Sequence, residues 1–333
     1  MKKTFRICMK GILIASLVMC GSVMGSDLDI SGFFDVTSTN QNSQDDKNEF
    51  GLGQAELDIE SELSPKANVA VAITYNDAEG AFELRAAELG FNLYSSENSS
   101  VTSLDIAAGQ FDVPFGIDYN WYPSIERKLV TSPMVVDMTH GGWNDFGAKL
   151  NVTSNAANLV VFAVNGFESS FEVSDAAQGL ALGLNVGDQV NTTPAHAFGG
   201  RLGLTPVSDL EIGGSVAMGI NQSSKDEMVL VGGDIQYSIN QVDFKGEYIT
   251  HSLNRSIEQE DNTGYYFQST YNIDPVFLIG RYGAFEPDGQ DWVKRYTFGA
   301  GYIIAENIQV RFESTINDNS DNNTNILQLA AGF

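Results

Sequence analysis

Short runs in which apolar and polar residues alternate recur along almost the whole chain beyond its first 27 residues. Successive side chains of a β-strand point to opposite faces, so each run predicts a strand with one apolar and one polar face. About sixteen such runs can be counted, an even number of the kind that single-chain bacterial barrels have. The clearest lie at residues 28–39, 50–63, 144–152, 210–220, 242–250 and 293–304.

The connections between these runs alternate in length. Tight joints lie at 64–68, 95–100, 154–158, 206–209, 239–241, 274–275 and 305–307, and longer polar joints at 41–49, 109–143, 168–195, 252–262, 286–291 and 318–323. Short turns at one rim and longer loops at the other are typical of outer-membrane barrels. We therefore predict an all-β, transmembrane antiparallel β-barrel. A soluble sandwich also alternates, but it has no reason to keep this parity, which only 77–80 and 222–225 disturb.

The mean hydropathy of −0.11 and the 18% content of charged residues do not oppose a membrane barrel, because only every second residue of a strand faces lipid. The first residues resemble an export signal, with four basic residues before or around a short apolar run at 11–19. We predict a signal peptide at 1–25, cleaved after Gly25, and a barrel at 26–333. A lipoprotein signal at Cys20 is the alternative, which Met19 disfavours, and the run is too short for a spanning helix.

Both cysteines, Cys8 and Cys20, lie in this predicted signal, so the exported chain would contain none. Removal of the four basic residues of the signal takes the formal net charge from −25 to −29. A surface this acidic excludes a nucleic-acid partner on electrostatic grounds.

Residues 109–143 interrupt the alternation. They contain Pro114, Pro123 and Pro133, and proline cannot donate to a central strand ladder. A stretch of about thirty residues without periodicity is typical of a functional loop. We predict that 113–142, between the fifth and sixth strands, folds into the lumen as a constriction loop.

If the apolar faces meet lipid, the polar faces line a channel, because about sixteen strands leave an aqueous interior. Charged side chains in such a channel set its ionic selectivity, although each could also serve only to pair with a neighbour and keep the wall hydrated. The phase of the run at 81–94 shifts near Ala86 and Ala87, which predicts a bulge and leaves the direction of Arg85 open. The predicted lumen-lining charges are Lys149, Arg201, Lys245, Arg295, Arg311, Glu56, Asp58 and Asp105, with further acidic residues at Asp35, Glu211, Asp234, Asp243, Glu247 and Glu313.

The motif GQFDVPFGIDY at 109–119, followed by ERK at 126–128 and WNDFG at 143–147, resembles the corresponding part of porins of the phosphate-selective O/P family. The resemblance covers roughly forty residues. It implies a sixteen-stranded, homotrimeric outer-membrane channel narrowed by this loop. The site residues it implies at the constriction are Asp112, Phe115, Asp118, Glu126, Arg127 and Lys128.

Arg127 and Lys128 match the basic character of the family's constriction, whereas Asp112 and Asp118 depart from it. We therefore expect a general or cation-tolerant pore rather than a phosphate-selective one. The leading hypothesis is a passive diffusion channel for small hydrophilic solutes and ions. The alternatives are a substrate-specific channel for phosphate, an organic acid or an iron chelate, and a plugged structural or adhesive surface barrel.

An enzymatic function is not expected. None of His140, His196 and His251 has the spacing of a metal site or a Ser-His-Asp arrangement, so no catalytic residue, metal or cofactor is predicted. The expected location is the bacterial outer membrane. The expected partners are outer-membrane lipid, lipopolysaccharide, two further copies in a homotrimer, and small hydrophilic solutes.

Overall fold

The computed structural model describes residues 28–42, 49–76, 81–121, 123–166, 195–221, 227–254, 259–318 and 323–333. The predicted signal peptide at 1–25, both cysteines and nearly all of the second long loop at 168–195 lie outside these ranges. The described residues form sixteen β-strands, one 3₁₀ helix and one short α-helix. The strands are β1 (Leu28–Gln41), β2 (Glu49–Ser64), β3 (Ala67–Asn76), β4 (Ala81–Ser95), β5 (Val101–Asp112), β6 (Asn144–Ser154), β7 (Ala157–Val164), β8 (Ala195–Val207), β9 (Leu210–Asn221), β10 (Glu227–Ile239), β11 (Val242–Asn254), β12 (Gln259–Ile273), β13 (Val276–Glu286), β14 (Val293–Ala305), β15 (Ile308–Asn317) and β16 (Thr324–Gly332).

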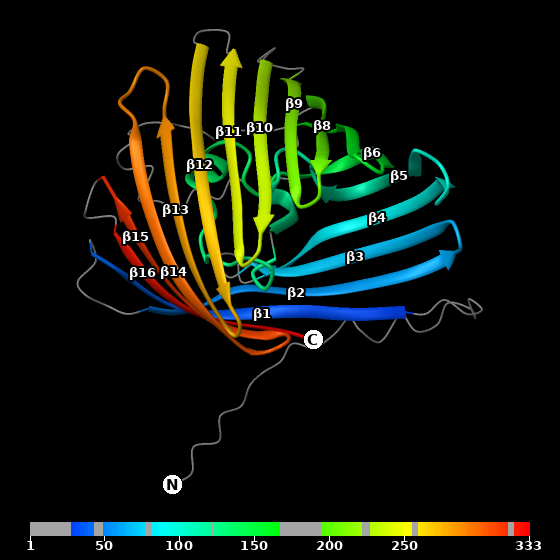
Figure 1. The fold of residues 1–333 in the computed structure, drawn as a ribbon. Helices are drawn as coiled ribbons and strands as arrows, with labels where there is room; N and C mark the ends of the chain where they lie inside the picture. Colours follow the sequence, from blue (N-terminus) through cyan, green and yellow to red (C-terminus); the bar gives the residue numbers. More distant parts are fainter. Residues whose placement is uncertain are drawn as a thin grey trace.

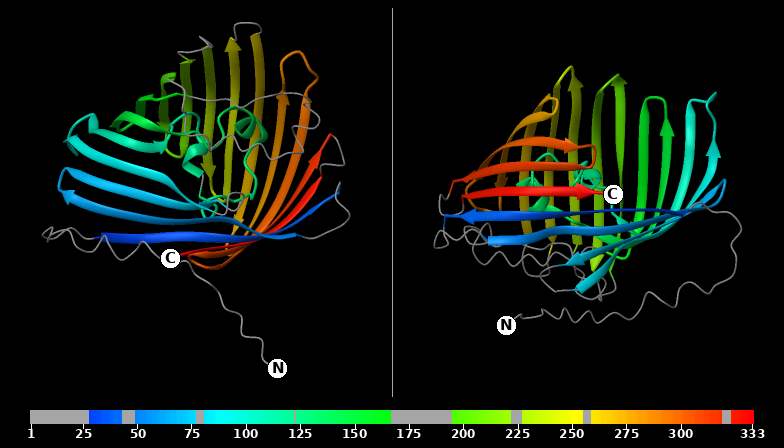
Figure 2. Two further views of the ribbon diagram at one scale, coloured as in Figure 1. Left: turned by 180° about the vertical axis from the view of Figure 1, so that it is seen from behind. Right: turned by 90° about the horizontal axis from the view of Figure 1, so that it is seen from below.

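Each strand pairs with its neighbours in the chain, and β1 pairs with β16, so the sheet closes into a barrel (Figures 1 and 2). All the pairings are antiparallel. At the β1–β16 seam, the Gly32 amide donates to the Phe333 carbonyl at 3.1 Å and the Phe333 amide donates to the Gly32 carbonyl at 2.9 Å. The predicted fold class, an antiparallel barrel of about sixteen strands, is confirmed.

The alternation in the sequence becomes the two faces of the wall. On β14, Phe298 has 54% of its surface exposed on the outside, while the adjacent Thr297 is fully buried on the inside. A shift of one residue in register would exchange the two faces along a whole strand, so the pattern fixes the register as well as the fold. None of the helices in the described ranges has the length and apolar character needed to cross a bilayer.

The predicted bulge in the fourth run is confirmed. The pairing of β3 with β4 passes from Ala72 opposite Ala86 to Ile73 opposite Leu84, which leaves Arg85 as an extra residue on β4. A bulge re-aims the side chains around it. It turns Arg85 towards the end of β5, where its guanidinium forms a salt bridge of 2.6 Å with Asp112.

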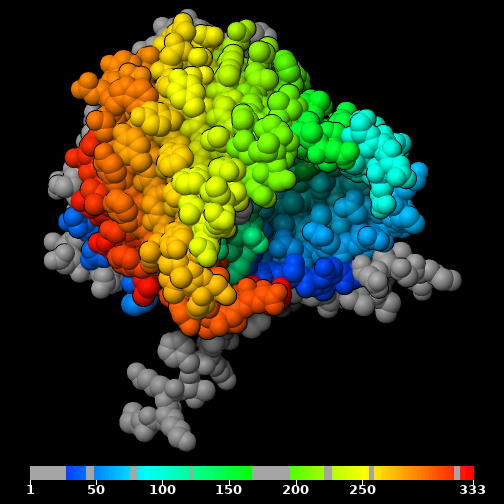
Figure 3. Space-filling model, in the orientation of Figure 1, coloured from blue at the N-terminus to red at the C-terminus, as the bar shows by residue number. Residues whose placement is uncertain are grey.

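Residues 113–142, which we call the inner segment, connect β5 to β6 and lie against the inside of the barrel (Figure 2). The segment contains the 3₁₀ helix η1 (Asp118–Trp121) and the helix α1 (Met134–Thr139), which packs on β11, β12 and β13. The space-filling view shows the barrel hollowed between its N-terminal strands, in blue, and β9 to β11, in green to yellow (Figure 3).

Candidate functional site

The inner segment leaves the wall through a closed neck. The Val113 amide donates to the Trp143 carbonyl at 2.9 Å, so the two ends of the segment meet beside β5 and β6. Gly116 then turns the chain with a φ of +65°, a conformation that residues with a Cβ rarely adopt. A Cβ added at Gly116 would also lie only 2.8 Å from a carboxylate oxygen of Glu247. A close approach of the chain to β11 therefore requires glycine here.

One side of the inner segment is apolar and is packed against the wall. Phe115, Met134 and Val135 are buried together with apolar residues of β10 to β13, such as Leu230 and Ile249. Full burial of a side chain of this size contributes about 1.5–3 kcal/mol. This packing holds the segment against one half of the barrel.

A second set of contacts fixes the middle of the segment to β13 and β15. The Glu313 carboxylate accepts hydrogen bonds from the amides of Val130 and Thr131, at 2.6 and 3.1 Å, and from the Thr131 hydroxyl at 2.6 Å. The Arg281 guanidinium donates to the carbonyl and the hydroxyl of Thr131, both at 2.9 Å. Thr131 is therefore held from both sides by opposite charges.

Earlier in the segment, backbone carbonyl groups of residues 124–127 accept hydrogen bonds from side chains of β15. The Arg311 guanidinium donates to the carbonyls of Ser124, at 2.6 Å, and of Arg127. The Gln309 amide donates to the Ile125 carbonyl at 2.5 Å. These bonds satisfy backbone acceptors at one buried and two partly buried positions.

The start of the segment is fixed to β9 and β11. The Gly116 amide donates to the Ser215 hydroxyl at 3.0 Å, and the Ile117 amide donates to the Glu247 carboxylate. Asp118 forms a salt bridge of 3.5 Å with Lys245. The segment is thus attached to β9, β11, β13 and β15, and it lies across the interior rather than along the strands from which it starts.

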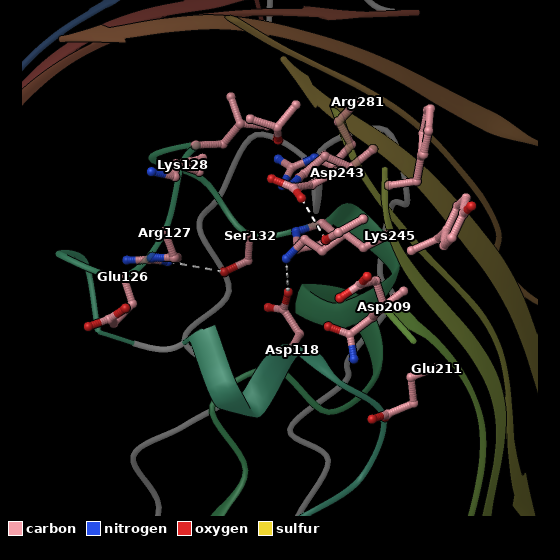
Figure 4. A pocket seen from close by; sticks show the side chains of 18 of the residues that line it. Asp118, Glu126, Arg127, Lys128, Ser132, Asp209, Glu211, Asp243, Lys245 and Arg281 are labelled. Atoms are coloured by element: carbon pink, nitrogen blue, oxygen red, sulfur yellow. Dashed lines mark hydrogen bonds and ion pairs between the residues drawn. The ribbon is translucent and has the colours of Figure 1, made fainter. Parts of the chain in front are cut away.

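A cavity of about 480 Å³ remains between residues 126–133 of the segment and the inner wall formed by β9 to β13 (Figure 4). Its lining includes Asp209, in the tight turn that joins β8 to β9, and Ser238, next to the turn that joins β10 to β11. Its polar lining is almost entirely charged or hydroxylated. The charged lining residues are Asp118, Glu126, Arg127, Lys128, Asp209, Glu211, Asp243, Lys245 and Arg281.

The structure brings together four of the six predicted constriction residues. Asp118, Glu126, Arg127 and Lys128 all line this cavity. Asp112 instead ends β5, bound to Arg85 and to the Asn144 amide at 2.8 Å. Phe115 has no exposed surface and stacks edge-on against His140, with 4.8 Å between ring centroids, so it belongs to the packing that holds the segment.

The predicted lumen charges fall into several groups. Arg201 binds Asp234 and Glu211 with shortest distances of 2.5 Å, and Lys149 binds Glu88 at 2.6 Å. Asp105 accepts a hydrogen bond from Asn92 at 2.7 Å, and the Nε of Arg295 donates to the side-chain oxygen of Asn317 at 2.8 Å. Lys245 and Arg311 bind the segment, and Glu56 and Asp58 lie on β2, which β1 and β16 separate from β15 in the closed barrel.

A second cavity, of about 380 Å³, lies along β2 to β6 near their tight turns. It is lined by Glu62, Lys66, Glu88, Asp105 and Lys149. The described contacts include one side-chain hydrogen bond from the segment to β2, in which Arg127 donates to the Gln54 amide oxygen at 3.2 Å. The interior therefore remains more open on the side of β2 to β6.

Ionisation of the segment depends on its surroundings. Burial raises the pKa of Asp137 to about 6, against the opposing effect of Arg295 and Arg281. Burial lowers the pKa of His140 to about 4, so this imidazole is neutral at physiological pH. Burial and the charge of Arg311 lower the pKa of Lys128, while Asp243 and Glu126 oppose that shift.

Within the ranges that the structure describes, no three His, Cys, Asp or Glu side chains gather in a way that could hold a metal ion. Sequence reasoning did not identify Thr131, Ser132, Gln54 and Gln309 as residues of this site. Thr131, Gln54 and Gln309 contact partners 73 to 184 residues away in the chain, and no local pattern signals such a pairing. Ser132 contacts Arg127, five residues away, within a segment that has no periodicity.

No protein-family model matches the sequence, and no curated protein matches it. The fold, however, is similar to those of solved outer-membrane proteins. The anion-selective porin from Comamonas acidovorans superposes with a TM-score of 0.67 at 10% identity, covering 93% of this chain and 100% of that one. The outer membrane channel DcaP of Acinetobacter baumannii gives 0.63 at 15% identity, covering 93% and 98%. In-vitro folded OmpT of Vibrio cholerae, in its trimer form, gives 0.62 at 12% identity, covering 93% and 99%. The chain therefore has a porin-like fold.

Proposed function

We propose that the protein is an outer-membrane porin, a passive diffusion channel for small hydrophilic solutes and ions. The observation that carries this proposal is the position of the inner segment. It is attached across the interior to β9, β11, β13 and β15, and it leaves charged cavities beside it. A polar lumen narrowed but not filled by one loop is suited to sieving solutes by size and charge.

The exterior of the barrel supports a membrane location. Large apolar side chains stand exposed around the wall, from Phe34 on β1 to Leu327 on β16. A soluble protein rarely exposes apolar surface on this scale. We therefore place the barrel in the bacterial outer membrane, with residues 1–25 as a cleaved export signal and with lipid and lipopolysaccharide around it.

Ionic selectivity follows from the charges of the wall. We propose a general or cation-tolerant pore, since the chain beyond residue 25 has 43 acidic residues and the predicted lumen contains many of them. Phosphate selectivity is not part of the proposal, because Asp118, Glu126, Asp209 and Asp243 line the cavity beside Arg127 and Lys128. Of the similar solved structures, DcaP is described as an outer membrane channel and one OmpT structure is of a trimer form. We propose that this protein likewise forms a channel and assembles as a homotrimer.

A substrate-specific channel is the second candidate, favoured by the cavity of about 480 Å³, a volume within the range of about 300–1,000 Å³ for small-molecule sites. Single-channel recording of the full-length protein in planar bilayers tests both. A conductance proportional to salt concentration supports the diffusion channel, and a conductance that saturates or is blocked by one solute supports the specific channel. The absence of any conductance would support a plugged surface barrel.

A further inference from the structure

The charges around the larger cavity are arranged by side. Arg127 and Lys128 belong to the inner segment, whereas Asp209, Glu211 and Asp243 belong to the barrel wall (Figure 4). The two sides must be compared by the charge that remains after internal pairing. A charge already bound to an opposite charge has little attraction left for a solute.

On the segment side, the positive charge is not neutralised by a carboxylate contact. Arg127 donates to the hydroxyl of Ser132, at 3.3 Å, and to the amide oxygen of Gln54, both neutral acceptors. The Lys128 ammonium lies over the ring of Phe277, 4.6 Å from its centroid. Neither residue forms a salt bridge with a described residue. Glu126 is the acidic group on this side, and it is exposed.

On the wall side, the negative charge of Asp243 is also free of a salt bridge with any described residue. Its two oxygens accept hydrogen bonds from Ser238, at 2.6 Å, and from Asn272, at 2.7 Å, which orient the carboxylate without neutralising it. Asp209 adds a second exposed carboxylate from the turn between β8 and β9.

Two further pairs in the cavity are internally compensated, since Glu211 is bound to Arg201 and Lys245 to Asp118. Arg281 donates to the carbonyl and hydroxyl of Thr131 and keeps its charge, but the two carboxylates of Asp209 and Asp243 outnumber it on the wall side. What remains is a net positive segment facing a net negative wall across a solute-sized space. Burial lowers the pKa of Lys128, and Asp243 opposes that shift more than the neighbouring Glu126 does, which agrees with this layout.

We propose that this cavity is a transit site for zwitterionic solutes of amino-acid size, with the solute carboxylate directed to Lys128 and Arg127 and its ammonium group directed to Asp243 and Asp209. The inference rests on the proposed channel function and specifies its preferred solute class. A purely anionic or cationic solute would gain one attraction and meet one repulsion, and an uncharged one would gain neither.

The test uses full-length protein in proteoliposomes and compares the swelling rates with L-glutamine and with L-arabinose, which are similar in mass. We expect glutamine to enter about fivefold faster, the ratio that corresponds to one favourable contact of about 1 kcal/mol between unit charges in water. The single variants Lys128→Gln and Asp243→Asn should each lower the glutamine-to-arabinose ratio. The charge exchange Lys128→Asp with Asp243→Lys should restore it with the solute reversed.

Lys294→Gln is the matched control, because it removes an exposed lysine near the start of β14 that lines neither cavity. It should leave the ratio unchanged. Unaltered arabinose entry in each variant shows that the barrel is folded. Equal rates for both solutes in the unmodified protein, or single variants that keep the ratio, would overturn the zwitterion site alone. Failure of both solutes to enter, together with no salt conductance, would overturn the channel and this inference with it.

Discussion

Two parts of the lumen differ in how their charges are used. The arginine wall is the inner face of β13 to β15, with Arg281, Arg295 and Arg311, and the acidic wall is the inner face of β2 to β6, with Glu56, Asp58, Glu88 and Asp105. The arginine wall binds the inner segment, and its guanidiniums donate to carbonyl, hydroxyl and amide oxygens. The acidic wall is met by the segment through the Arg127–Gln54 contact.

The difference shows that the same residues can attach the inner segment to the wall and contribute positive charge to the lumen. A guanidinium that donates to a neutral oxygen holds its partner and remains fully charged, because a hydrogen bond to a carbonyl removes no charge. The acidic wall instead neutralises part of its own charge by ion pairs such as Lys149 with Glu88. One wall therefore positions the loop while the other gives the open path its negative character.

The largest effect is expected from Glu313→Gln on the arginine wall. The carboxamide can keep its oxygen as the acceptor of the Val130 and Thr131 amides but carries no charge, and hydrogen bonds to charged groups contribute about 1.5–3 kcal/mol each, against about 0.5–1.5 kcal/mol for neutral ones. The docked state of the segment should lose at least a factor of about ten in population, since about 1.4 kcal/mol corresponds to tenfold. Single-channel recordings should show a larger and noisier conductance. Asp105→Asn, whose carboxylate binds Asn92 on the acidic wall, should change it far less. Equal effects of the two would remove the distinction between the walls.

A smaller effect, with a sign that depends on the wall, is expected when each wall loses one charge that forms no hydrogen bond with a described residue of the segment. Arg295→Gln removes a charge bound to Asn317, and Asp58→Asn removes one from β2. A unit charge about 7 Å from the path of an ion changes its energy in water by about 0.6 kcal/mol, or about threefold in relative permeability. Reversal potentials in a salt gradient should move towards cations in the first variant and towards anions in the second. Shifts of the same sign would contradict the assignment of both residues to the conducting path.

The pH dependence of selectivity sharpens the comparison at the arginine wall itself. Asp137 on α1 faces Arg295 and Arg281, and burial raises its pKa to about 6. Lowering the pH from 7.5 to 5 protonates this carboxylate and removes a negative charge, so the preference for cations should fall through pH 6. The change should be smaller than that from Asp58→Asn, because the two arginines remain. Reversal potentials of Asp137→Asn should lack this step, and an identical pH profile in that variant would exclude Asp137 as its source.

The smallest effect is expected for the ion pair on the acidic wall. Lys149 and Glu88 are 2.6 Å apart, but about a quarter of each side chain is exposed. Partly exposed pairs contribute less than about 1 kcal/mol. Lys149→Gln should therefore lower the free energy of unfolding only slightly in denaturant titrations of the protein in lipid. A loss of several kcal/mol would show that this pair, and not the arginine wall, organises the interior.

The sequence alone allowed most of the barrel to be predicted, because the alternation has the period of a strand and the even count follows from closure. It also indicated that the segment around Pro114, Pro123 and Pro133 leaves the wall. The direction of Arg85 could not be predicted, since a bulge breaks the two-residue period on which the inference depends.

The wall on which the segment docks could not be predicted either. The contacts of Glu313 and Arg311 with residues 124–131 join positions more than 180 residues apart, and they depend on backbone amides and carbonyls that every sequence has. Phe115 was assigned to the constriction because it lies in a motif, yet burial is a property of its three-dimensional neighbours. Such assignments require coordinates or relatives of known structure.

The seam between β1 and β16 has a consequence for biogenesis. β1 finds one of its two partners only in β16, and beside this pairing the Gly32 and Phe333 amides each donate to the carbonyl of the other residue. Until β1 and β16 pair, the backbone donors and acceptors along one edge of each strand can bind only water, a chaperone or another chain. The unfolded chain must therefore be protected from aggregation while these two strand edges are unpaired. The barrel in the bilayer is closed only when β16 has paired with β1.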